Sequence, residues 1–87
     1  MIRDLPAELL SILEENGFRE VSAGEWENST MKIILLERTV VDIEVLVSRR
    51  ERGVVTTWTE SAGSYELNLD NDRERLVQRL RMLFAEG

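Results

Sequence analysis

Two carboxylates, Asp42 and Glu44, have the spacing in this chain that comes closest to a catalytic arrangement. If they lie on a strand, they project from the same face about 6 to 7 Å apart. With magnesium, such a pair could begin a nuclease site that uses Asp plus Glu-x-Lys, but the residue two positions after Glu44 is Leu46. Because the lysine of that motif is missing, we expect a hydrated carboxylate pair balanced by Lys32 or Arg38.

The chain contains neither cysteine nor histidine in its 87 residues. Without cysteine there are no disulfides and no thiolate nucleophiles, and without histidine the commonest metal ligand and general base is missing. The 5 glycines are scattered, so no glycine-rich phosphate loop is present. We therefore expect a protein that is not an enzyme and has no cofactor. A metal-dependent enzyme using Asp42 and Glu44 is the least favoured alternative.

Arginines are concentrated in the stretch SRRERGVVTTWTE, and the last predicted helix carries Arg75 and Arg79 on its outer face. This pattern would suit a basic finger beside an aromatic stacking platform, or simply the tip of a hairpin. The net charge of -6 comes entirely from residues 1–44, which argues against a general polyanion-binding surface. Nucleic-acid binding therefore remains the alternative function, with candidate contacts at Arg49, Arg50, Arg52, Arg75 and Arg79.

Acidic side chains also mark the first predicted helix, where Glu8, Glu14 and Glu15 lie outside the apolar stripe. Such a face could mimic phosphates and bind a basic partner. The ordinary interpretation, a solvated helix surface, is the favoured one, and a binding face for a basic partner is the alternative.

Both ends of the chain show the apolar periodicity of amphipathic helices. The first predicted helix covers residues 5–13, and Asn16-Gly17 supplies its stop signal. The second covers residues 72–85, and Asn71 with Glu74 provides a capping box at its start. The apolar stripes consist of Leu5, Leu9, Ile12 and Leu13 in the first helix and Leu76, Val77, Leu80, Leu83 and Phe84 in the second.

The region between the helices is rich in β-branched and alternating residues, which predicts strands. Predicted strands cover residues 18–27, 31–37, 40–47 and 54–60, with a small polar loop at 61–64 before the last helix. The sequence therefore predicts a single α+β domain spanning residues 1–87. Its expected order is an N-terminal helix, an antiparallel meander of three to four strands, and a C-terminal helix, with both helices on one face of the sheet.

A sheet covered on one face needs only one apolar phase, so surplus apolar residues on the other phase are informative. We place a loop at residues 37–39, Lys32 across from Glu44, and Val47 across from Val55. This register puts Trp58 near Glu44 on the outer face. The apolar residues then expected on the outer face are Ile34, Leu36, Val40, Leu46, Val54 and Trp58. An exposed apolar patch of this kind indicates an interface, and we expect it to form a homodimer or bind a protein partner.

The stretch ELLSILEENGFREV is similar to the start of HicA-type toxin ribonucleases, in which a helix ends in Gly-Phe before a strand. The order helix, three strands, helix also resembles double-stranded-RNA-binding domains. HicA proteins need a histidine soon after that strand, whereas this chain reads SAGEWENSTMKI there. The basic helix-terminal motif of the RNA-binding domains is also absent, because the last helix starts LDNDRERL. Neither resemblance therefore assigns a functional residue.

The N-terminal sequence MIRDLPAELL lacks the basic and apolar regions of a signal peptide, and the longest apolar run is too short to span a bilayer. We expect a complete cytoplasmic protein without a membrane partner. Taken together, the sequence favours a small non-enzymatic protein-interaction domain, acting as a homodimer or as a regulator or inhibitor of a protein partner.

Overall fold

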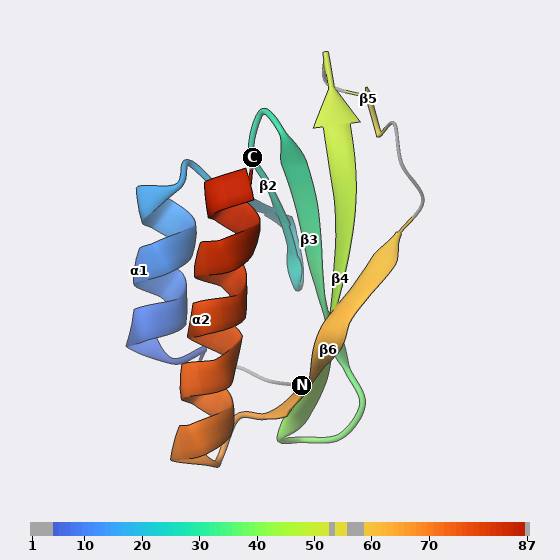
Figure 1. Ribbon diagram of the computed structural model, residues 1–87. Coiled ribbons are helices and arrows are strands. Elements are labelled where there is room, and N and C mark those ends of the chain that lie inside the picture. The colour runs from blue at the N-terminus through green and yellow to red at the C-terminus, as the bar shows by residue number, and fades with distance from the viewer. Residues whose placement is uncertain (1–4, 53, 56–58, 87) are drawn as a thin grey trace.

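The computed structural model describes residues 5–52, 54–55 and 59–86 (Figure 1). Two helices flank a run of antiparallel strands, as the sequence predicts for an α+β domain. The elements in chain order are α1 (Ala7–Glu15), β1 (Arg19–Ser22), β2 (Glu25–Glu27), β3 (Met31–Glu37), β4 (Asp42–Glu51), β5 (Val54–Val55), β6 (Glu60–Glu66) and α2 (Asp70–Glu86).

The strands form an antiparallel meander in the order β1-β2-β3-β4, and one edge of β4 is shared by β5 and β6. β5 pairs with the end of β4, at Arg50 and Glu51, whereas β6 pairs with β4 from Asp42 to Val47. The sheet therefore contains more strands than the three to four expected. β4 pairs with β3 along one edge and with β5 and β6 along the other, so it is the central strand of the sheet.

The extra strands come from two segments with small residues. Residues 18–27 form β1 and β2 rather than one strand, because the chain turns at Gly24, which has a φ of 74°. A Cβ at Gly24 would lie 3.0 Å from the carbonyl oxygen of Leu35, so glycine suits the turn for space as well as for φ. The expected loop at 61–64 lies instead inside β6, where the register with β4 shifts at a bulge and Gly63 has a φ of 111°.

The core lies between the helices and one face of the sheet, and in Figure 1 both helices lie on the same side of the sheet. The strand residues that alternate with the predicted outer-face residues form the core, since Ile33, Ile43 and Val45 are fully buried. The helix stripes are buried or partly buried against this core, and the rings of Phe18 and Phe84 are 5.0 Å apart between their centroids. The buried apolar residues of the two helices are Leu9, Ile12, Leu13, Leu76 and Leu80.

Two predicted cross-strand pairs are wrong. Lys32 lies opposite Ser48 rather than Glu44, because the β3–β4 turn covers residues 38–41 instead of 37–39. Thr39 closes this longer turn by accepting a hydrogen bond on Oγ1 from the Asp42 N–H at 3.0 Å.

The second wrong pair concerns the strand after the arginine cluster. Val47 lies opposite Glu60 rather than Val55, because the next pairing segment on this part of β4 is β6. β4 continues to Glu51, four residues beyond the predicted end of this strand at residue 47. Val55 pairs with Arg50 in this added part of β4. Trp58 was expected near Glu44, but it lies outside the residues that the structure describes.

Leu80→Ala tests the packing of α2 against the sheet. Leu80 is completely buried, so losing its side-chain carbons should lower the free energy of unfolding by about 2–5 kcal/mol. The matched control is Met82→Ala on the same helix, where 57% of the side chain is exposed and the loss should be about 0.5 kcal/mol or less. Urea denaturation followed by circular dichroism measures both values, and equal losses would contradict this packing.

Candidate functional site

The sheet face opposite the helices carries an apolar cross-strand pair at its centre. Ile34 on β3 lies directly opposite Leu46 on β4, and both side chains are half-buried. Leu36, two residues along β3 on the same face, is 37% exposed. We call Ile34, Leu36 and Leu46 the outer-face cluster. The structure therefore brings together three of the six residues predicted for a partner interface.

The other three predicted interface residues do not all join this cluster. Val40 lies in the turn before β4 and Val54 lies opposite Glu51 at its far end, and both are well exposed. Because β4 has 10 residues, these two valines are separated by about 30 Å of strand. Trp58 lies outside the described residues. The candidate interface is thus a compact centre rather than a patch along the whole hairpin.

Ion pairs flank the outer-face cluster at both ends. Toward the β2–β3 end, Lys32 Nζ lies 2.9 Å from a carboxylate oxygen of Glu25 and 3.9 Å from one of Glu27. Arg50 lies 3.3 Å from Glu27, and its guanidinium also donates to the carbonyl oxygen of Asn28 at 2.7 Å. Opposite charges therefore surround the apolar centre in alternation, which keeps the outer face free of a single-sign field.

Glu44 anchors the other end of this arrangement. Its carboxylate pairs with Arg38 and accepts a hydrogen bond from the Ser61 hydroxyl at 2.9 Å. These contacts, with Arg38 the larger cause, hold the pKa of Glu44 below its usual value. The Lys32 ammonium likewise lowers the pKa of Glu25, and Glu25 raises the pKa of Lys32. All three groups are solvent-exposed enough that such pairs contribute little to stability.

The spacing of Asp42 and Glu44 does not lead to a recognisable metal site. Arg38, one of the two cations predicted to balance the pair, forms an ion pair with the Glu44 carboxylate. Asp42 has a buried Oδ1 atom without a hydrogen-bond partner among the described residues. Within that part of the chain, no group of three or more acidic side chains is placed to hold a metal ion.

The arginines predicted to contact nucleic acid are divided among different surfaces. Arg50 lies on the outer face, in the ion pairs described above. Arg52 is exposed at the hairpin tip, with a φ of 55°. Arg75 on α2 pairs with Asp72 at 2.9 Å, and its guanidinium carbon lies 5.3 Å from the centre of the Tyr65 ring. Within the part of the chain that the structure describes, Arg49 and Arg79 line the same hollow.

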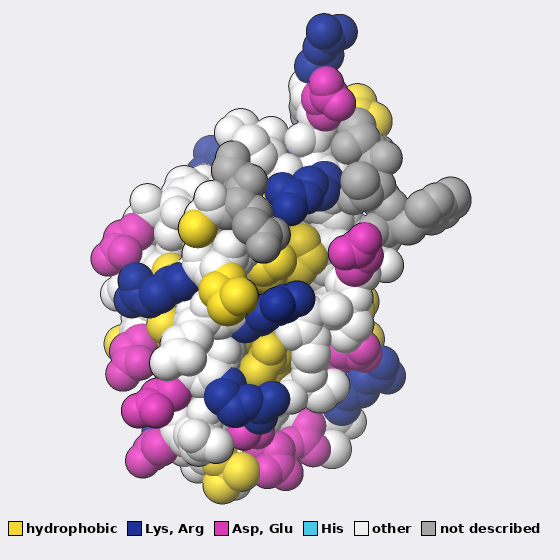
Figure 2. Space-filling view, in the orientation of Figure 1, with side chains coloured by type: hydrophobic (Ala, Val, Ile, Leu, Met, Phe, Trp, Pro, Cys, Tyr) yellow, Lys and Arg dark blue, Asp and Glu magenta, His cyan; other side chains and the backbone are white. Residues whose placement is uncertain are grey.

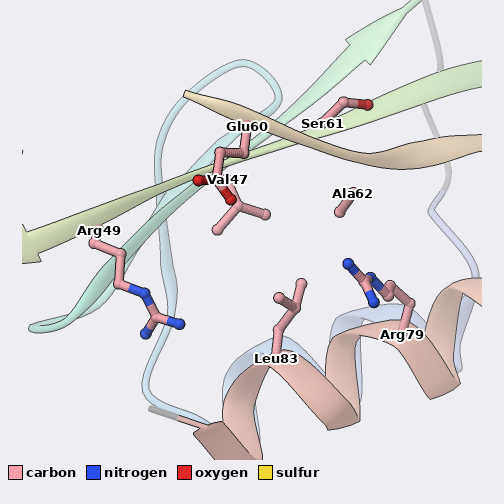
Figure 3. A pocket seen from close by; sticks show the side chains of 7 residues that line it. All are labelled: Val47, Arg49, Glu60, Ser61, Ala62, Arg79 and Leu83. Carbon is pink, nitrogen blue, oxygen red and sulfur yellow. The ribbon is translucent and has the colours of Figure 1, made fainter. Parts of the chain in front are cut away.

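That hollow lies between α2 and the strands β4 and β6, on the helix side of the sheet. It measures about 180 Å³, and we call it the α2–β6 groove. Figure 2 shows basic side chains over the seam between α2 and β6, with hydrophobic side chains exposed between them. In Figure 3, Leu83 and Arg79 point from α2 toward the hollow, and Val47 reaches it from β4. The lining residues are Val47, Arg49, Glu60, Ser61, Ala62, Arg79 and Leu83.

This groove was not predicted from the sequence. Arg49 and Arg79 are 30 positions apart, and their proximity depends on how α2 packs along β6. The alternation of β4 could have placed Arg49 on the same face as Val47, but no sequence signal gives the position of α2.

The three acidic residues predicted on the first helix are all exposed on α1. The buried side of α1 consists of Leu9, Ile12 and Leu13, so Glu8, Glu14 and Glu15 lie away from the core. Their arrangement is that of a solvated helix surface, and the structure adds no second feature that would mark a binding site there.

The chain has no significant match among models of protein families, curated proteins or solved structures. Among the described residues, no helix combines the length and apolar character needed to cross a membrane.

Arg38→Gln should raise the pKa of Glu44 toward its usual value, because it removes the cation that stabilises the carboxylate. A depressed pKa in the folded protein contributes stability above the unfolded pKa, and that contribution is lost as the pH falls through the folded pKa. The substitution should therefore weaken the acid dependence of stability in that range. Side-chain carboxyl NMR titration of Glu44 measures the shift. Arg81→Gln serves as the control, and equal Glu44 pKa values in the wild type and Arg38→Gln would contradict the assignment.

Proposed function

We propose that this chain is a non-enzymatic cytosolic protein-interaction domain that forms a homodimer through the outer-face cluster. The observation that carries the proposal is the Ile34–Leu46 pair, which lies at the centre of the sheet face opposite the helices. An antiparallel sheet with one solvated face normally alternates between apolar core residues and polar surface residues. Three apolar side chains interrupt that alternation in neighbouring positions of two paired strands.

The outer-face cluster has the size of the centre of an interface, and a whole interface would be larger. Burying an exposed leucine or isoleucine fully is worth about 1.5–3 kcal/mol, and these side chains are already partly covered. Three of them supply only part of the free energy of a stable dimer. A twofold symmetric contact uses every such residue twice, because the same patch is presented by both subunits.

The charge arrangement around the cluster favours a second copy as the occupant. An interface between two identical subunits must be self-complementary, so a patch of one sign would repel itself. Here Lys32 and Arg50 alternate with Glu25 and Glu27 at one end, and Arg38 pairs with Glu44 at the other. Both signs are therefore available wherever the second copy meets the rim.

The overall charge of -6 opposes the association of two copies at long range. Salt screens repulsion between exposed charges that are farther apart than about 8–10 Å at physiological ionic strength. The apolar centre is not weakened by moderate salt. We therefore expect the dimer to strengthen as salt is added, which is the opposite of the behaviour expected for nucleic-acid binding.

Leu46→Glu should convert the dimer to a monomer. A buried charge without a partner costs about 3–5 kcal/mol, which weakens association by a factor of about a hundred or more. The matched control is Val40→Glu, which adds the same charge at a side chain that is 79% exposed in the β3–β4 turn. Light scattering should give twice the chain mass of 10.1 kDa for the wild type and the control, and 10.1 kDa for Leu46→Glu.

Circular dichroism of Leu46→Glu checks that the variant remains folded, since the side chain points away from the core. A wild-type mass of 10.1 kDa across the accessible concentration range would overturn the homodimer. An unchanged dimer in Leu46→Glu would place the interface elsewhere on the molecule.

A further inference from the structure

We propose that the α2–β6 groove binds an extended acidic peptide segment of a partner protein. In this arrangement an apolar side chain of the peptide enters the hollow, and a carboxylate two residues along, which points to the same face of an extended peptide, meets Arg79. The groove lies on the helix side of the sheet and shares no residue with the outer-face cluster. The inference therefore does not depend on the proposed homodimer.

The size and lining of the hollow fit one side chain rather than a whole small molecule. Pockets for cofactors and drug-sized ligands usually measure about 300–1,000 Å³. This hollow has about 180 Å³, and its apolar lining comes from Val47, Ala62 and Leu83. Val47 and Ala62 are nearly buried, and Leu83 is half-buried on α2. A single aliphatic side chain from a partner would complete the packing among these three.

The charge around the hollow selects an acidic neighbour for that side chain. Arg79 is exposed at the edge of the groove and makes no hydrogen bond or ion pair with the residues that the structure describes. By contrast, Arg75, one turn earlier on α2, is occupied by Asp72. Arg49 lines the opposite side of the hollow. A carboxylate beside the apolar side chain can therefore form a charge-assisted hydrogen bond with Arg79.

Strand β6 supplies a reason for the peptide to be extended. Among the described strands, β6 pairs only with β4, so it forms one edge of the sheet. Near Leu67 this edge is closed by α2, since the Glu66 N–H donates to Asp72 at 2.8 Å and Arg73 donates to the Leu67 carbonyl at 2.7 Å. Beside the groove the strand carries the small residues Ser61 and Ala62, which allow another backbone to approach closely.

A nucleic acid fits the same groove less well. Single-stranded nucleic acids are held by bases stacked on aromatic rings, and no aromatic residue in the part of the chain that the structure describes lines this hollow. The Tyr65 ring on β6 already faces Arg75. Glu60 at the rim and the net charge of -6 oppose a continuous row of phosphates. A peptide can place a single carboxylate at Arg79 and keep its other groups away from Glu60.

The test measures binding of a short fluorescein-labelled peptide to the full chain by fluorescence anisotropy. In this peptide valine and glutamate stand two positions apart with serine between them, so that both face the groove when the peptide is extended. We expect saturable binding to the wild type that weakens by about tenfold or more in Arg79→Glu, the size expected for loss of a charge-assisted hydrogen bond. Arg81→Glu is the matched control, because it makes the same charge change on the same helix outside the groove lining. Its affinity should stay within about twofold of the wild type, as surface charges away from a site have small effects.

A second measurement locates the site. Backbone amide shifts in the ¹⁵N spectrum should move along β6 and the last two turns of α2, and they should move equally in Leu46→Glu, whose outer face is altered. No peptide binding, or equal losses in Arg79→Glu and Arg81→Glu, would overturn the proposal. Displacement of the peptide by a single-stranded oligonucleotide that itself binds more tightly would also overturn it, in favour of a nucleic-acid groove.

Discussion

The pairing register between β3 and β4 is the constraint on which the rest of the structure depends. It places Ile33 opposite Val47 and Leu35 opposite Val45, and this face lies under the helices. Because side chains alternate with a period of two, the same register puts Ile34 opposite Leu46 on the other face. A shift by one residue would exchange the two faces and expose the core. Burial of one apolar phase therefore determines which apolar residues remain outside.

Strand β4 connects the two candidate surfaces. Its helix-side residues include Val47 and Arg49, which line the α2–β6 groove, whereas Leu46, directly before Val47, belongs to the outer-face cluster. The two surfaces thus lie back to back across a single strand. A partner bound at one surface leaves the other accessible, so self-association and peptide binding are compatible in the same molecule.

Much of the fold could be predicted from the sequence because local patterns carry it. The stripe containing Leu76 and Leu80 and the alternation through Ile43 and Val45 indicated which side chains are buried. The longer β3–β4 turn and the placement of β6 could not be derived in this way. The turn depends on the hydrogen bond from the Asp42 N–H to Thr39, and the pairing of β6 depends on the bulge near Gly63. Neither feature shows in the alternation of apolar and polar residues.

The candidate sites differ in the same respect. The outer-face residues Ile34, Leu36 and Leu46 follow from alternation alone, so the sequence was sufficient to propose them. Arg49 and Arg79 line the same groove because α2 packs beside β6, and the sequence placed them in one basic set with arginines that point elsewhere. Composition can therefore suggest which residues bind a partner, but long-range packing decides which of them act together.

The most direct test of this account is an isotope-filtered NMR experiment on a mixture of labelled and unlabelled chains. It detects contacts between the methyl groups of one copy and the protons of another. If the outer-face cluster is the dimer interface, intermolecular contacts should appear at the methyl groups of Ile34, Leu36 and Leu46, and none at the buried methyl groups of Ile33 and Val45. Intermolecular contacts confined to α1 or α2, or none at concentrations well above those used for light scattering, would contradict it.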